Sequence, residues 1–243
     1  MRSLVAMTIA VLTLSGCAQI SAQFENAQDP EPVTRNQEAG PILVTRQWGV
    51  VDGMLSVVVS NTTSRTMRYA DAVLTARDAQ NVLIASTSTA ARDPGCCDVM
   101  DLPPGAEFGF YFDVGEAGRR IERVDVVYRN VQWEPFQRDR TSTATATPVR
   151  LRANPLGAVV VADVTVKGRL LPQARAQAFL SDREGDFLAV VSGRWNCFDA
   201  GKRRIRMQLF HPVPPGTQVD SVMIYPITHD QDWPQPTCQR SGS

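Results

Sequence analysis

The chain has 243 residues, with 25 basic and 25 acidic side chains, so its formal net charge is zero. A neutral chain gives no electrostatic case for nucleic acid, whose binding requires a surplus of basic side chains against phosphates. We also expect no basic stripe suited to anionic lipid, because the run Lys202-Arg203-Arg204 is short and is typical of a solvated strand start.

The first 16 residues read as an export signal. One positive charge, Arg2, precedes an apolar run from Leu4 to Leu14, and small residues follow it. This layout is typical of a secretory signal peptide, and the run is shorter than the roughly 20 residues that a membrane-spanning helix needs. We therefore expect residues 1–16 to be removed from the mature protein.

The residues at this junction also predict how the protein is held. The string Leu14-Ser15-Gly16-Cys17 resembles the lipobox of bacterial lipoproteins, in which the cysteine is acylated and becomes the new N-terminus. The resemblance implies a lipid anchor on Cys17 and a place in the cell envelope, on the extracytoplasmic side of a membrane. The residue after Cys17 is Ala18 and not an aspartate, which would favour retention in the inner membrane. We therefore expect the outer membrane if the host has one.

Residues 17–40 are predicted to form a flexible lipidated tether. The run Gln28-Asp29-Pro30-Glu31-Pro32 and its neighbours are polar and proline-rich and lack apolar periodicity. Such a segment cannot bury enough apolar surface to offset the entropy cost of ordering.

The rest of the chain predicts an all-β fold, because short alternating apolar runs are separated by turn residues. In the first domain, residues 41–135, Phe108, Phe110 and Phe112 are expected on one face of a strand. The other strands are expected at Ile42–Trp48, Met54–Val59, Met67–Arg77, Val82–Thr89 and Ile121–Tyr128.

A second series of strands follows and predicts a second domain at residues 148–230. Residues 136–147, rich in Thr, Ser and Arg, are expected to be a linker, and residues 231–243 a C-terminal tail. The strands are expected at Val149–Ala153, Ala158–Val166, Ala174–Ser181, Phe187–Ser192, Arg204–Phe210 and Val219–Ile227.

The two domains share landmarks in the same order. The segment Val73–Leu83 matches Gln177–Phe187, each being a strand, an aspartate, polar residues, Asn or Gly, and a strand. The aspartate side chain is expected to cap a tight turn, and Asn81 or Gly185 to adopt a positive φ. Two copies of one β-sandwich module are therefore predicted.

This pattern resembles the small immunoglobulin-like FxLYD domains of bacterial envelope proteins. The resemblance rests on Ala178-Phe179-Leu180-Ser181-Asp182 and, more loosely, on Val73–Asp78; neither copy has the tyrosine before the aspartate. It implies two consecutive immunoglobulin-like β-sandwiches in an extracytoplasmic setting and no activity, because a fold alone does not define a function.

Four cysteines besides Cys17 suggest disulfides in an exported protein. One pairing joins Cys197 to Cys238 and the adjacent Cys96 to Cys97; the other joins Cys96 and Cys97 separately to Cys197 and Cys238. We prefer the first, because it requires no particular docking of the two domains.

No catalytic motif is present, so we expect no enzymatic activity and no cofactor. The predicted function is a non-enzymatic binding or assembly module, held at a membrane by its lipid anchor, with an unidentified envelope protein as partner and no nucleic acid. The alternative is a copper or redox-linked ligand site at Cys96, Cys97 and Met100, which are soft ligands. His229, beside Asp230 and Asp232, is a weaker cation-site candidate and more typical of an exposed loop.

Overall fold

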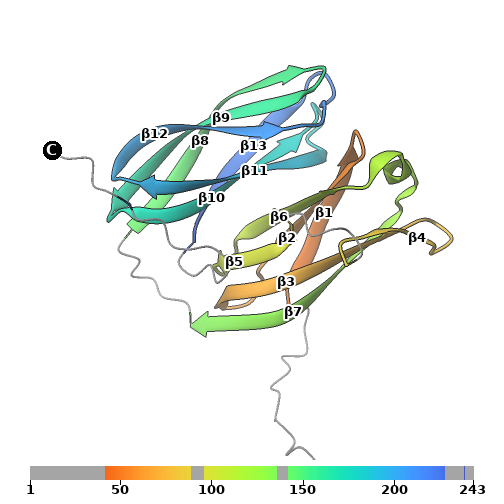
Figure 1. Cartoon of the computed structure of the whole chain (residues 1–243), viewed down its shortest axis with the longest axis horizontal. Coiled ribbons are helices and arrows are strands. Elements are labelled where there is room, and N and C mark those ends of the chain that lie inside the picture. The colour runs from red at the N-terminus through yellow and green to blue at the C-terminus, as the bar shows by residue number, and fades with distance from the viewer. Residues whose placement is uncertain (1–41, 89–95, 136–141, 228–237, 239–243) are drawn as a thin grey trace, which may run out of the picture. The chain divides into compact units, whose positions relative to one another are not determined.

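The predicted all-β fold is confirmed by a computed structural model of the chain, which describes residues 42–88, 96–135, 142–227 and 238. Thirteen strands and one 3₁₀ helix, η1 (Gly115–Arg120), occur among them (Figure 1). The expected signal peptide, the tether, and the tail apart from Cys238 lie outside the described residues. Residues 41–243 belong to one compact unit.

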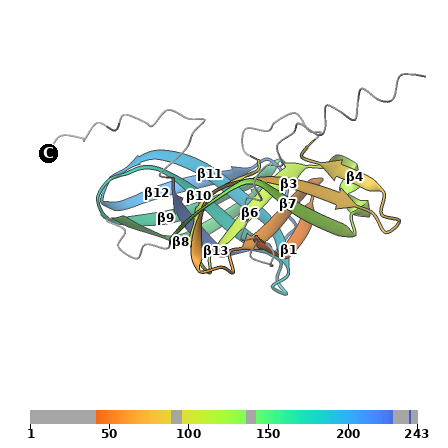
Figure 2. The same cartoon turned by 90° about the horizontal axis from the view of Figure 1, so that it is seen from below.

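The first half of this unit is a pair of antiparallel sheets. One has the strand order β1-β2-β6, and in the other β3 pairs with β4 and β5 and, at its other edge, with β7. Figures 1 and 2 both show the long strands β3 and β7 side by side. The strands are β1 (Val44–Val51), β2 (Met54–Ser60), β3 (Arg65–Arg77), β4 (Leu83–Ser86), β5 (Asp98–Leu102), β6 (Glu107–Asp113) and β7 (Arg123–Pro135).

The core of this half lies between its two sheets. Phe108, Phe110 and Phe112 are all buried there, as their alternation predicted. Strand β5 was not predicted; its residues Val99 and Leu102 join this core after the cysteine pair.

The second half repeats the same topology. Its sheets have the orders β8-β9-β12 and β11-β10-β13, which match β1-β2-β6 and the sheet built on β3. The strands are β8 (Ser142–Asn154), β9 (Gly157–Gly168), β10 (Leu171–Ser181), β11 (Phe187–Phe198), β12 (Gly201–Leu209) and β13 (Gln218–Pro226).

The matched turns are built alike. The Asp78 carboxylate accepts hydrogen bonds from the backbone N–H groups of residues 80 and 82, at 3.0 and 2.8 Å. Asp182 does the same with residues 184 and 186, at 3.0 and 2.8 Å. Asn81 and Gly185 take φ values of 63° and 91°. The repeat seen in the sequence is thus a repeat of strand order and of turn chemistry.

The predicted linker at residues 136–147 is wrong over its second half, because β8 begins at Ser142. Here alanines alternate with threonines, and Ala144 and Ala146 pack on the core of the second half. Threonine favours strands, but alanine is a weak apolar signal, so the sequence alone does not reveal the period of two. Pro148 is tolerated because β8 is an edge strand. Residues 136–141 lie outside the described residues.

The two halves share a buried interface. Every residue of β2 is buried, although alternate residues of a strand face opposite sides. Val57 lies in the core of the first half, whereas Val58 packs with Phe179 and Val190 of the second half. Strand β10 is buried almost throughout. The face of β2 that points away from the first core therefore lies against the face of β10 that points away from the second core.

Polar side chains at this interface satisfy backbone groups of the opposite half. The Gln177 amide accepts a hydrogen bond from the Gly109 N–H at 2.8 Å and donates one to the Gly109 carbonyl at 2.6 Å. The Ser56 hydroxyl accepts a hydrogen bond from the Val190 N–H at 3.1 Å. A Cβ atom on Gly109 would lie 2.4 Å from a Val190 methyl carbon. The contact is therefore specific in shape and in hydrogen bonding.

Candidate binding pocket

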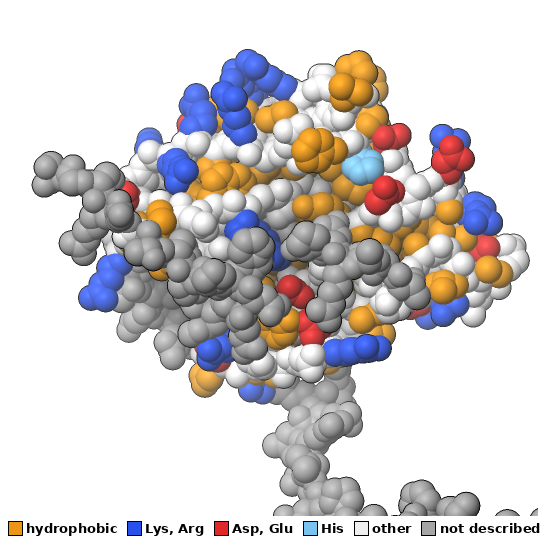
Figure 3. All heavy atoms as spheres, viewed as in Figure 1, with side chains coloured by type: hydrophobic (Ala, Val, Ile, Leu, Met, Phe, Trp, Pro, Cys, Tyr) orange, Lys and Arg blue, Asp and Glu red, His pale blue; other side chains and the backbone are white. Residues whose placement is uncertain are grey.

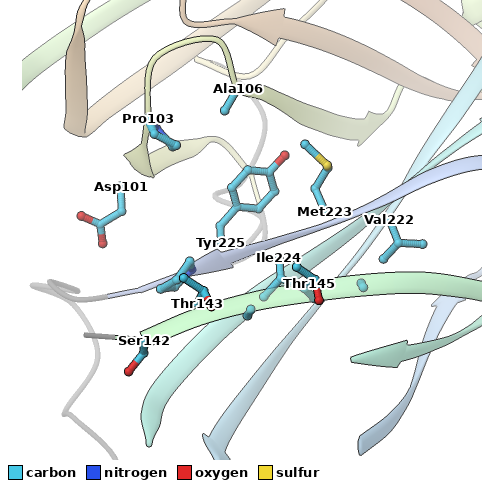
Figure 4. A pocket seen from close by; sticks show the side chains of 13 residues that line it. Asp101, Pro103, Ala106, Ser142, Thr143, Thr145, Val222, Met223, Ile224 and Tyr225 are labelled. Atoms are coloured by element: carbon cyan, nitrogen blue, oxygen red, sulfur yellow. The ribbon is translucent and has the colours of Figure 1, made fainter. Parts of the chain in front are cut away.

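A cavity of about 470 Å³ lies where the two halves meet (Figure 4). Its size falls within the range of small-ligand pockets. The lining comes from the edge strand β8, the edge strand β13, the end of β5 and the turn between β5 and β6. The lining residues are Asp101, Pro103, Ala106, Ser142, Thr143, Ala144, Thr145, Ala146, Val222, Met223, Ile224, Tyr225 and Pro226.

Two strand edges bound the pocket. Residues 142–146 of β8 and 222–226 of β13 line it consecutively, so both faces of each strand contribute. Each strand stands at the edge of its own sheet, and no strand pairing joins β8 to β13 in the part of the chain that the structure describes. An edge strand presents unpaired N–H and C=O groups. The pocket thus combines an apolar lining with main-chain hydrogen-bonding capacity.

Alternation along β13 divides its side chains between two environments. Val222 and Ile224 pack on the core of the second half. Met223 and Tyr225 pack on the core of the first half, and Figure 4 shows both projecting toward the side of Pro103 and Ala106. This strand therefore connects the two cores along one wall of the pocket.

Tyr225 is held in place at this wall and has a structural role. Its hydroxyl donates a hydrogen bond to the Glu107 backbone carbonyl, and its ring centroid lies 5.4 Å from that of Phe108. Burial raises the pKa of Tyr225 far above its usual value, with a further contribution from the charge of Glu107. The phenol therefore stays neutral at ordinary pH and fastens β13 to the start of β6.

Asp101 is the one carboxylate among the described residues that line the pocket. It is 4% exposed, and its backbone adopts a positive φ of 49° just before the turn. A single carboxylate among apolar and hydroxyl side chains gives a binding site polarity at one end.

The structure contains the preferred disulfide pairing. Cys197 is bonded to Cys238, with a Cα–Cα distance of 5.4 Å, and Cys96 is bonded to Cys97. The first bond joins the end of β11 to the chain after β13. Neither disulfide lines the pocket.

The alternative copper or redox site gains no support from this geometry. Met100 is 5% exposed and Cys97 is 7% exposed, and sulfurs joined in a disulfide do not act as thiolate ligands. Within the described residues, no group of three or more His, Cys, Asp or Glu side chains is arranged to hold a metal ion.

The remaining predicted site residues cannot be placed. Cys17, His229, Asp230 and Asp232 lie outside the described residues. In the described part of the chain, no helix has the length and apolar character needed to cross a membrane. The pocket itself carries no sequence motif; the alternation of Ala and Thr before Pro148 was the one usable signal.

No protein-family model matches the chain, and no curated protein matches it.

Proposed function

We propose that the chain is a lipid-anchored cell-envelope protein that acts as a non-enzymatic binding or assembly module. Acylated Cys17 holds it on the extracytoplasmic side of a membrane, the outer membrane if the host has one. The partner is an envelope protein, and the two halves are FxLYD-like modules. The lipobox resemblance supports the anchor, and the pocket at the junction of the halves supports the binding role.

The observation that carries the binding role is the pair of edge strands, β8 and β13, beside an apolar cavity. An extended peptide that enters such a site gains main-chain hydrogen bonds from a strand edge and places alternate side chains in the pocket. Thr143 and Thr145 are exposed along β8, and Ile224 and Pro226 lie along β13. The ligand proposed here is therefore an extended segment of a partner protein with at least one apolar side chain.

The test is site-specific photocrosslinking in the native host. A benzophenone amino acid at Thr145, in the pocket, is expected to give one reproducible protein adduct. The control places the same amino acid at Thr62, which is exposed in the β2–β3 loop of the first half. We expect no such adduct from this position. The Thr145 adduct identifies the partner by mass spectrometry.

A second pair of variants ties the adduct to the pocket. Ala106→Leu adds volume inside the lining and is expected to abolish the Thr145 adduct. Ala79→Leu, in the exposed turn after β3, makes the same chemical change elsewhere and should leave the adduct intact. An adduct that survives Ala106→Leu, or one that Thr62 captures equally well, would contradict the proposed site.

A further inference from the structure

The sheet β8-β9-β12 turns a basic face away from the core of the second half. Val160, Ala162 and Val164 of β9 lie in the core, so residues 159, 161, 163, 165 and 167 point the other way. Strand register sets the neighbours of these positions on β8 and β12. Arg152 and Gln208 flank Val159, Arg150 and Arg206 flank Val161, Thr147 and Arg204 flank Asp163, and Thr145 and Lys202 flank Thr165.

This face carries a large positive charge for a neutral protein. Its six cations, all exposed, are Arg150, Arg152, Lys167, Lys202, Arg204 and Arg206. Asp163 is the one carboxylate at these outward positions, and it pairs with Arg204 at 2.7 and 3.1 Å. The positions from 159 to 167 extend over about 27 Å at the rise of a β-strand. Figure 3 shows Lys and Arg side chains gathered at the upper left, over this sheet.

Two large apolar side chains stand at one end of the same sheet. Leu156, in the turn from β8 to β9, is 83% exposed, and Phe210, directly after β12, is 75% exposed. They belong to neighbouring segments, because a Cβ atom on Gly157 would lie 3.3 Å from the Phe210 Cα atom. Val149, on β8, is 44% exposed as well.

We infer that the β8-β9-β12 face docks on an anionic phospholipid bilayer. The basic side chains contact the headgroups, and Leu156 and Phe210 enter the boundary between headgroups and acyl chains. A membrane is the partner that satisfies both features, since a nucleic acid would neutralise the cations and leave the apolar end in water. A basic surface is also an effective second signal beside a lipid anchor. This inference goes beyond the proposed pocket and does not require acylation of Cys17.

This face was not predictable from the sequence, because the cations come from three strands. Arg150 and Arg206 lie 56 positions apart in the chain, yet both neighbour Val161 in the sheet. Runs of charge along the chain and the total charge do not reveal such a face, because they take no account of which strands are neighbours. The structure therefore revises the expectation that the chain has no basic stripe for lipid.

The test uses residues 17–243 with Cys17→Ser, so that no acyl chain contributes to binding. Sedimentation with vesicles of about 30% phosphatidylglycerol in phosphatidylcholine is expected to show binding that pure phosphatidylcholine does not, and salt should weaken it. Removal of two charges by Arg150→Gln with Arg206→Gln should lower the partition coefficient about 25-fold, at roughly fivefold for each charge near an anionic surface. The matched control is Arg119→Gln with Arg120→Gln, which removes two exposed arginines from η1 of the first half and should leave binding within about twofold.

A second comparison separates a membrane from other polyanions. Leu156→Ser with Phe210→Ser should lower vesicle binding about tenfold. Val82→Ser with Leu83→Ser, which changes exposed apolar residues at the β3–β4 turn, should not. The inference is overturned if the parent protein ignores anionic vesicles at low salt. It is also overturned if the apolar pair has no effect and duplex DNA binds equally well. Neither result bears on the pocket or on acylation of Cys17, which have tests of their own.

Discussion

Gln177 offers the sharpest test of how the two halves are joined. Its side chain is 1% exposed, and both amide atoms are hydrogen-bonded to the backbone of Gly109 in the opposite half, at 2.8 and 2.6 Å. Gln177→Leu keeps most of the side-chain volume and removes both bonds. Water cannot replace them without opening the interface, so the N–H and C=O groups of Gly109 lose their partners.

The expected loss of stability follows from these two groups. A buried backbone group left without a partner costs about 1–3 kcal/mol, and burial of the added leucine carbons offsets a part of this. We expect Gln177→Leu to lower the free energy of unfolding by about 2–4 kcal/mol. The measurement is equilibrium urea unfolding of the oxidised protein, followed by both fluorescence and circular dichroism.

Gln132→Leu is the matched control, because Gln132 is exposed on β7 and surface changes rarely exceed about 0.5 kcal/mol. In the parent, both probes should report one transition, because the halves share an interface. In Gln177→Leu the two probes are expected to separate as the halves uncouple. Equal stability of the two variants would refute this account of the interface.

Four further predictions concern single features of the fold. Tyr128→Phe should raise stability by about 1 kcal/mol, because the Tyr128 hydroxyl is buried and has no partner among the described residues; Tyr225→Phe should lower it by about as much, because it removes a made hydrogen bond. Burial raises the pKa of Tyr225 in the folded state, so stability is retained below the unfolded pKa of about 10 and falls above it; urea midpoints at neutral and alkaline pH should show a smaller fall in Tyr225→Phe. Asp78→Ala and Asp182→Ala each remove two hydrogen bonds to backbone N–H groups and should lower stability by similar amounts, about 1–3 kcal/mol, in thermal unfolding; a large difference between them would contradict the repeat. Cys238→Ser opens a disulfide with a sequence separation of 41 and should cost about 4 kcal/mol in urea unfolding on the chain-entropy scale; an unchanged urea midpoint would show that this bond does not stabilise the fold.

The features that were predictable from the sequence are those that depend on neighbours along the chain. Phe108, Phe110 and Phe112 alternate with smaller or polar residues, and all three enter the core. The turns at Asp78 and Asp182 were also predictable, because an aspartate side chain reaches the backbone two to four residues ahead. The repeat then followed from these local signals.

The features that were missed depend on contacts between distant segments. The sequence predicts a linker up to residue 147, and a strand only from Val149, because Ala144 and Ala146 are small; yet both alanines pack on the core of the second half. The pocket exists because residues 142–146 and 222–226 come together beside Asp101 of β5 and the turn that follows it. The basic face likewise depends on strand register, which total charge does not report.

We propose above that lipid on Cys17 holds the protein at a membrane. The most direct measurement is mass spectrometry of the N-terminal peptide from protein purified from its native host. We predict that the mature chain begins at Cys17 and carries acyl chains on that residue. A chain that begins at Met1 with an unmodified Cys17 would contradict the claim.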